Sequence, residues 1–212
     1  FVNAYGQRHR ILQQQVRGYK KFDPKPKQQK VVPARVLQRL IERAVTEKDK
    51  HIADLIGGSF FFACRSCEYS EVPGECKTRI IELGTIQFYK GRRFLDHRDP
   101  LLVDADTVTI TFVLQKNNVK YDSITQWSCG PDEVLCPVKR WARLVQRICS
   151  YPGSTDSTPV NVFMDHFSHT VTRITSHDIV TALRSAARSF GADDLGFDPN
   201  SLGTHSIRSG AA

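Results

Sequence analysis

The sequence predicts an α+β protein in which helices outnumber strands. Apolar residues recur at helical spacing towards both ends of the chain. Runs rich in β-branched residues, with partial alternation of apolar and polar positions, occupy the middle. Helices followed by strands and then by helices again are typical of a small antiparallel sheet with segregated helices.

Length and composition agree with one large domain, or one domain with an appendage. The chain has 212 residues, of which 40% are hydrophobic, so it can bury a sizeable core. It contains no apolar run of about 18 residues, which excludes a predicted membrane span. Its start does not resemble a signal peptide and lacks Met, so we expect a chain that is not secreted and was taken from a longer protein.

The N-terminal part divides into a helix tail and a linker. Residues 3–22 place apolar side chains among Gln and Arg, and a segment rich in Pro and Lys follows. Such a segment is expected to be extended and exposed. We therefore divide the chain into the C-terminal end of a helical domain (1–22), a linker (23–32) and a second domain (33–212).

Two helices are expected next. Pro33 suits the first turn of a helix, and the apolar residues from Val36 to Val45 recur at helical spacing. A second helix is predicted at about 49–66, and its stretch 55–63 is apolar almost all round, which indicates burial. Arg65 would emerge at the end of this helix and be held rigidly.

The middle of the chain predicts strands at 79–83, 85–89, 107–114 and 119–126. Asn117 and Asn118 suit a tight hairpin turn between the last two, because Asn tolerates positive φ. The remaining elements are a helix at 137–149, a surface loop at 151–159, a short strand at 160–164, a helix from Ser176 to about Gly191, and a final helix for which Thr204 is a possible N-cap.

The net charge of +8 is concentrated near the N-terminus. Residues 1–43 hold eleven Lys and Arg against two acidic residues, whereas the rest of the chain holds 19 basic and 20 acidic residues. A basic arm of this kind usually follows a polyanion, most often nucleic acid, although it can also be a solvated lead-in that only aids solubility. We expect DNA contacts from Arg17, Lys20, Lys21, Lys25, Lys27, Lys30 and Lys120.

The six cysteines are interpreted as structural thiols in a reducing compartment. Cys64 and Cys149 fall in apolar stretches, where free Cys behaves as a small hydrophobe. Cys64 and Cys67 together with Cys76 raise the alternative of a zinc site, but a structural site needs a second pair at matched spacing. The sequence provides no such pair, so we expect no metal.

Four polar residues suit phosphodiester transfer without a metal. That reaction needs positive charge on the non-bridging oxygens, a proton for the leaving oxygen, and a base or orienting group. Arg65 and Arg208 suit the first task, because a guanidinium matches two phosphate oxygens. Lys116 at the hairpin tip suits the second, and His205 would act as base or hydrogen-bond donor.

Two further residues belong to this hypothesis. Glu68 would brace the site through Arg65, and Lys120 competes with Lys116 for the role of general acid. Each feature alone has a simpler explanation: an Arg–Glu pair at a helix end, a solubilising lysine, and the start of a capped helix. The order and context of these residues favour the joint interpretation.

In that order, these residues resemble the tyrosine recombinase (integrase) superfamily from about Val31 to the end. Arg65-Ser-Cys-Glu68 looks like the family's first-arginine box, and Thr204-His-Ser-Ile-Arg-Ser-Gly looks like its second box. Thr175-Ser-His-Asp-Ile, leading to Arg188 and Gly191, resembles the helix before the second box. The motif Arg-Ser-Cys-Glu-Tyr most resembles the corresponding motif of transposon-encoded eukaryotic members, such as those of DIRS-type retrotransposons or cryptons.

The resemblance implies a mostly helical catalytic domain, preceded by the tail of a DNA-binding domain. It implies cleavage and rejoining of double-stranded DNA through a 3′-phosphotyrosyl intermediate, without cofactor, by a homo-dimer or tetramer in the full-length protein. The location would be nuclear in a eukaryote and otherwise cytoplasmic, with no membrane partner.

One departure from the family pattern is large. The family's nucleophilic tyrosine follows the second box by some tens of residues, whereas this sequence stops four residues after Arg208 and all six of its tyrosines precede the box. We therefore expect this fragment alone to bind DNA without completing strand transfer. The alternatives are a non-catalytic DNA-binding module derived from a recombinase, an enzyme resembling type IB topoisomerases, and a cysteine–zinc protein.

Overall fold

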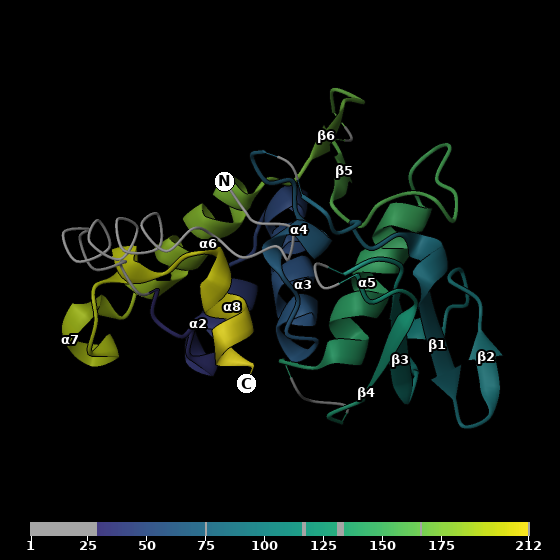
Figure 1. Ribbon diagram of the computed structural model, residues 1–212, viewed down its shortest axis with the longest axis horizontal. Helices are drawn as coiled ribbons and strands as arrows, with labels where there is room; N and C mark the ends of the chain where they lie inside the picture. The colour runs from purple at the N-terminus through teal and green to yellow at the C-terminus, as the bar shows by residue number, and fades with distance from the viewer. Residues whose placement is uncertain (1–28, 75, 116–117, 131–133, 166, 212) are drawn as a thin grey trace, which may run out of the picture.

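The computed structural model describes residues 29–74, 76–115, 118–130, 134–165 and 167–211. Helices occupy one side of the molecule and a four-stranded sheet the other (Figure 1). The helices are α2 (Ala34–Glu42), α3 (Glu47–Phe61), α4 (Ser66–Tyr69), α5 (Pro137–Cys149), α6 (Ser176–Arg188), α7 (Gly191–Leu195) and α8 (Thr204–Gly210), with 3₁₀ turns at Leu83–Thr85, Leu102–Asp104 and Pro199–Ser201. This mixture confirms the α+β class.

The sheet is antiparallel throughout. It consists of β1 (Ile86–Lys90), β2 (Arg93–Leu95), β3 (Thr107–Phe112) and β4 (Asp122–Trp127), in the order β2-β1-β3-β4. The central strand β3 buries most of its residues, whereas β4 forms an edge and is largely exposed. A separate hairpin of β5 (Val162–Met164) and β6 (Val171–Arg173) projects from the body (Figure 1).

The core is centred on α3 and α5, with α5 lying between α3 and the sheet (Figure 1). Residues 51–59 of α3 are all buried, so the burial predicted for 55–63 holds for 55–59 and residue 62, whereas residues 60, 61 and 63 are partly exposed. Gly58 permits the close approach of the two helices, since a Cβ there would lie 2.8 Å from Nε1 of Trp141. Trp141 itself is fully buried. No helix in the described ranges is long and apolar enough to cross a membrane.

The second predicted helix has different bounds. It starts at Glu47, after a capping box formed by Thr46 and Asp49, and it ends at Phe61 rather than near residue 66. Ala63 has a φ of 48°, its N–H donates to the carbonyl of Phe60, and the N–H of Cys64 donates to that of Ser59. This is a Schellman motif, which closes the last turn of a helix. Arg65 therefore does not end α3 but precedes α4.

Several other helices and strands also differ from their predicted bounds. The predicted strand at 79–83 is absent, because the N–H groups of Ile81 and Leu83 donate to the carbonyls of Glu68 in α4 and Thr158 in a loop instead of a neighbouring strand. Helix α2 ends at Glu42, which leaves Val45 78% exposed. Strands β1, β3, β4 and β5 are shorter than predicted or shifted by up to three residues, while β2 and β6 were not predicted. The helix at 137–149 is confirmed at both ends.

Candidate DNA-phosphate site

Arg65 is positioned by its own backbone and by Glu68. It occupies the N-cap position of α4, where its N–H donates to Oε2 of Glu68 at 2.7 Å and its Nη1 donates to Oε1 at 3.0 Å. Only 3% of the Glu68 side chain is exposed, against 20% of the Arg65 side chain. A buried carboxylate thus holds a guanidinium whose outer part reaches solvent, and charge-assisted hydrogen bonds of this kind are strong and directional.

Gln115 links Arg65 to the β3–β4 hairpin. Nη1 of Arg65 donates to Oε1 of Gln115 at 3.2 Å, and Nε2 of Gln115 donates to Oδ2 of Asp122 at 3.3 Å. The N–H of Gln115 also donates to the carbonyl of Val119 at 2.9 Å, which closes the hairpin end, and Asn118 there has a φ of 59°. The turn end of the hairpin therefore lies at the first-arginine box.

The two lysines predicted as general acid differ in what the structure describes. Lys116, like Asn117, lies outside the described residues. Lys120 is exposed. The choice between Lys116 and Lys120 as general acid stays open.

The second box forms α8, and Gly203 rather than Thr204 is its N-cap. The N–H of Gly203 donates to Oγ of Ser206, and the N–H of Ser206 donates to the carbonyl of Gly203, both at 3.0 Å. Ser206 and Ile207 are buried, which turns His205 and Arg208 outwards. The two exposed side chains are three residues apart and so share one face of the helix.

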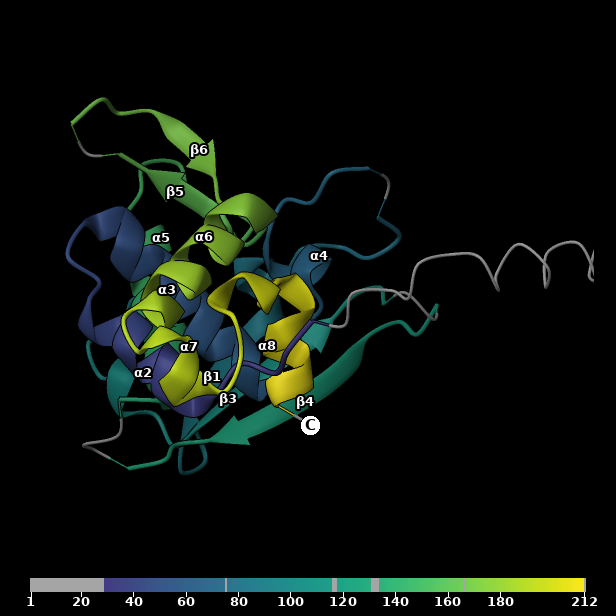
Figure 2. The same cartoon turned by 90° about the vertical axis from the view of Figure 1, so that its left-hand side faces the viewer.

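Helix α8 packs directly on α3, as both views show (Figures 1 and 2). A Cβ at Gly210 would lie 2.8 Å from the carbonyl oxygen of Val32 and 2.9 Å from the ring of Phe60. The final glycine of the second box therefore allows α8 to reach the C-terminal end of α3, immediately before Arg65.

Residues of both boxes influence the thiol of Cys64. Burial raises the pKa of this thiol well above its ordinary value and the charge of Glu68 raises it further, while Arg208 and Arg65 act in the opposite direction. The packing of α8 on the end of α3 brings the two boxes, which are far apart in the sequence, into the same region of the molecule.

The end of the linker is fastened to the second box. The N–H groups of Lys30 and Val32 donate to the carbonyls of Ser201 and Ser206, both at 3.2 Å. Oε1 of Gln29 accepts from the N–H of His205 at 2.9 Å. Lys30 is exposed as predicted, but Val32 is only 1% exposed, so the linker is not exposed up to its end. The other basic residues predicted to bind DNA, Arg17, Lys20, Lys21, Lys25 and Lys27, lie outside the described residues.

Helix α6 supports the loop before α8. Nε of Arg184 donates to the carbonyl of Leu202 at 2.9 Å, and Nη2 of Arg188 donates to Oδ1 of Asn200 at 3.1 Å. From the sequence, Arg188 was identified only through the family resemblance, and Gln29, Gln115 and Arg184 were not predicted. Gln115 could have been found, because it is a polar residue directly before the hairpin lysine.

The cysteines do not form the zinc site that was considered. Among the described residues, no group of three or more His, Cys, Asp or Glu could hold a metal ion. Cys64 is buried beside Ser59, whereas Cys67 and Cys76 meet at Thr78.

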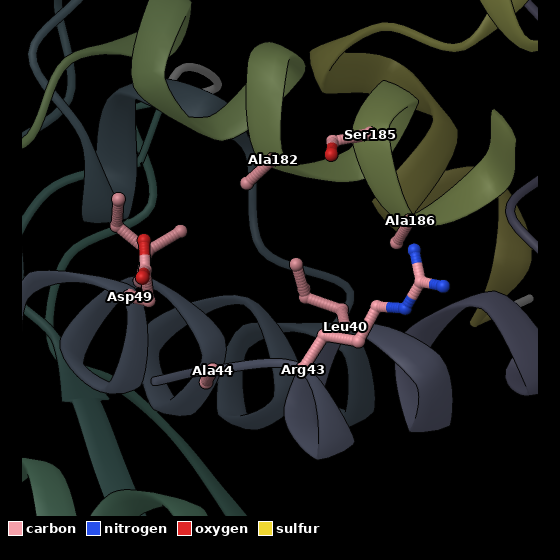
Figure 3. A pocket seen from close by; sticks show the side chains of 8 residues that line it. Leu40, Arg43, Ala44, Asp49, Ala182, Ser185 and Ala186 are labelled. Carbon is pink, nitrogen blue, oxygen red and sulfur yellow. The ribbon is translucent and has the colours of Figure 1, made fainter. Parts of the chain in front are cut away.

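A pocket of about 190 Å³ lies between α6 and the α2–α3 pair (Figure 3). None of the predicted site residues lines it, and most of its wall is aliphatic. Its lining residues are Leu40, Arg43, Ala44, Asp49, Ile52, Ala182, Ser185 and Ala186. It is therefore separate from the candidate phosphate site.

Comparisons with protein-family models, with curated proteins and with solved structures found no match to this chain.

Proposed function

We propose that this chain binds double-stranded DNA and holds a backbone phosphate between Arg65 and Arg208, as the catalytic domain of a site-specific tyrosine recombinase. The observation that carries the proposal is the convergence of the two boxes. Helix α8, which carries Arg208, packs on the end of α3 that leads to Arg65, and Gln115 ties Arg65 to the β3–β4 hairpin. Two guanidinium groups on such neighbouring elements suit the charge that develops on a phosphate in the transition state.

Each residue has a distinct role in the proposal. Arg65 and Arg208 bind the non-bridging oxygens, and Glu68 fixes the orientation of Arg65. His205, on the same helix face as Arg208, acts as base or hydrogen-bond donor at the phosphate. Lys116, or Lys120, delivers the proton to the leaving 5′-oxygen. No cofactor takes part in these steps.

Two of the described tyrosines, Tyr69 and Tyr151, do not suit the nucleophile. Tyr69 is nearest to Arg65 in sequence but is fully buried, and burial, followed by the charges of Cys64, Cys67 and Glu68, raises the pKa of its hydroxyl. Burial also raises the pKa of Tyr151. The proposal therefore assigns the 3′-phosphotyrosyl bond to a tyrosine C-terminal to the second box, where the family resemblance places it.

The test is the formation of a covalent adduct on DNA. A protein carrying sequence beyond Ala212 is incubated with duplexes that contain a nicked suicide site, and products are separated on a denaturing gel. We expect an adduct that Arg65→Ala and Arg208→Ala both abolish. Arg92→Ala is the matched control, because Arg92 is exposed on the β1–β2 turn and should leave the adduct unchanged.

Two other outcomes would redirect the proposal. Salt-sensitive DNA binding without an adduct would favour a non-catalytic DNA-binding module. An adduct that forms and reseals on single sites, without assembly of two sites, would favour a topoisomerase-like reaction over recombination. Assembly as a homo-oligomer on DNA stays a prediction, and sedimentation of the DNA complex would measure it.

A further inference from the structure

The thiols of Cys67 and Cys76 are brought together by one hydroxyl group. Oγ1 of Thr78 lies 2.7 Å from Sγ of Cys67, to which it donates, and 2.8 Å from Sγ of Cys76. The two sulfur atoms are therefore no further apart than these two contacts combined, and they also interact with each other. The contacts of two other cysteines differ from this arrangement, since Cys64 contacts Ser59 and Cys136 accepts from the backbone N–H of Cys129.

The two thiols differ in the way that a dithiol exchange reaction requires. Cys76 is exposed, and although burial acts to raise the pKa of its thiol, hydrogen bonds from Cys67 and Thr78 outweigh that effect and lower it. Cys67 is half-buried, and burial together with its hydrogen bond to Cys76 raises the pKa of its thiol to about 11. An exposed thiol with a lowered pKa attacks disulfides first, and a neighbouring thiol then resolves the product.

We propose that Cys67 and Cys76 form a redox-sensitive dithiol that closes to an intramolecular disulfide when it meets a low-molecular-weight disulfide such as oxidised glutathione. The Cys76 thiolate attacks one sulfur of the small disulfide, which forms a mixed disulfide and releases one small thiolate. Cys67 then loses its proton to solvent and attacks Sγ of Cys76, which releases the second small thiolate. Two electrons pass from the two cysteines to the small disulfide, which is reduced to two thiols.

The position of Cys67 gives the disulfide a consequence for the phosphate site. Cys67 lies in α4 between Arg65 and Glu68, whose ion pair orients the guanidinium. Closing the S–S bond to about 2 Å draws α4 towards the loop that carries Cys76. Because Oγ1 of Thr78 now contacts both sulfurs, it must move aside. This consequence, unlike the disulfide itself, rests on the proposed function, and it predicts weaker DNA binding by the oxidised protein.

The experiment equilibrates the whole chain with reduced and oxidised glutathione at a series of ratios. The products are alkylated, digested without reductant and identified by mass spectrometry. We expect a linked Cys67–Cys76 peptide that has lost two hydrogen atoms and that reverts when reduced glutathione is restored. Cys67→Ser should accumulate a stable glutathione adduct on Cys76, whereas Cys76→Ser should leave Cys67 as a free thiol.

Cys149→Ser is the matched control, because Cys149 is half-buried at the end of α5 and should not alter the linked peptide. Separate glutathione adducts on both cysteines, or a disulfide that joins a different pair, would overturn the proposal. DNA binding is measured on the same samples. If the reduced protein fails to bind DNA, the proposed function fails while the disulfide result stands. If oxidation leaves DNA binding unchanged, the link to Arg65 fails.

Discussion

Two arginine–carboxylate clusters in this protein have the same N–O distance but differ in how far the arginine side chain is exposed to solvent. Arg65 meets Glu68 at 3.0 Å in the candidate phosphate site, and Arg140 meets Asp54 at 3.0 Å between α3 and α5. The side chain of Arg65 is 20% exposed, whereas that of Arg140 is 5% exposed.

Arg140 and Asp54 are enclosed by structure. The stem of Arg140 packs so closely on α3 that a Cβ at Gly57 would lie 3.2 Å from it, and Arg147 also meets Asp54 at 3.0 Å. These contacts hold two helices together, whereas Arg65 keeps a face that a ligand can reach. A carboxylate partner alone therefore does not assign a role to an arginine. The burial of the guanidinium decides whether its N–H groups can still donate to a ligand.

The buried cluster should carry the larger stability effect. Asp54→Ala would leave Arg140 and Arg147 without their shared carboxylate, and breaking a buried ion pair in this way costs about 3–5 kcal/mol of unfolding free energy. Denaturant unfolding followed by circular dichroism measures the change. Glu42→Ala is the matched control, since the exposed Arg39–Glu42 pair at 3.6 Å should contribute less than about 1 kcal/mol. Equal effects of the two substitutions would contradict the distinction.

The exposed cluster should carry the larger effect on DNA. Arg208→Ala would remove a charged phosphate contact worth about 1.5–3 kcal/mol of binding free energy. It should also lower the slope of log affinity against log salt by about one. Fluorescence anisotropy with a labelled duplex at several salt concentrations measures both quantities. Arg140→Ala should show the reverse pattern, with lower stability and an unchanged salt slope in the folded protein.

His51, close to the buried cluster, should make stability depend on pH. Its Nε2 contacts the carbonyl of Val160 at 3.0 Å, and burial, with a further contribution from Arg147, lowers its pKa to about 3. The folded protein therefore keeps His51 neutral while the unfolded chain binds a proton below about pH 6.5. Stability is full above that pH and falls by about 1.4 kcal/mol per pH unit as the pH drops towards 3.

The comparison of wild type with His51→Gln isolates this contribution. Gln can still donate to the Val160 carbonyl but does not titrate. Burial raises the pKa of Asp54, with Arg140 and Arg147 acting against it, and this carboxyl contributes the opposite slope in both proteins. The difference in unfolding free energy between wild type and variant should therefore change with pH only below about 6.5. A pH-independent difference would show that His51 is not buried in its neutral form.

The smallest effect concerns the turn that separates the buried helix from Arg65. Ala63 has a φ of 48°, a conformation that costs an L-residue about 1–2 kcal/mol and glycine almost nothing. Ala63→Gly should therefore raise the unfolding free energy by about 1 kcal/mol. Ala53→Gly, within α3, is the matched control and should lower it, since glycine weakens a helix interior. A loss of stability in both variants would contradict the assigned turn.

The sequence predicted the elements whose signals are local. The helix at 137–149 came from periodicity and from Pro137 at its start, and the burial of α3 came from its continuous apolar stretch. It also placed Arg65 close to Glu68, since the two residues are three apart. The missed strands β2 and β6 have three residues each, which is too short for a periodic signal.

The end of α3 shows why boundaries were harder. Residues 62–65 continue an apolar, helix-compatible pattern, but Ala63 adopts the left-handed conformation that closes a Schellman motif. Propensity alone does not place an alanine there, so tertiary packing overrode the local preference. The strand predicted at 79–83 is absent for a related reason, since its backbone N–H groups donate to carbonyls of α4 and of the loop before β5.

By itself the sequence determined the class of the fold, its long helices and the residue types that suit a phosphate, because each follows from neighbours within a few positions. Only the tertiary structure decided that the helix of Arg208 packs beside the segment of Arg65, that Gln115 joins Arg65 to the hairpin, and that Cys67 meets Cys76 at Thr78. It also decided that Arg140 is enclosed against Asp54. Contacts between distant segments depend on how whole helices and loops pack, and no local pattern of residues encodes that packing.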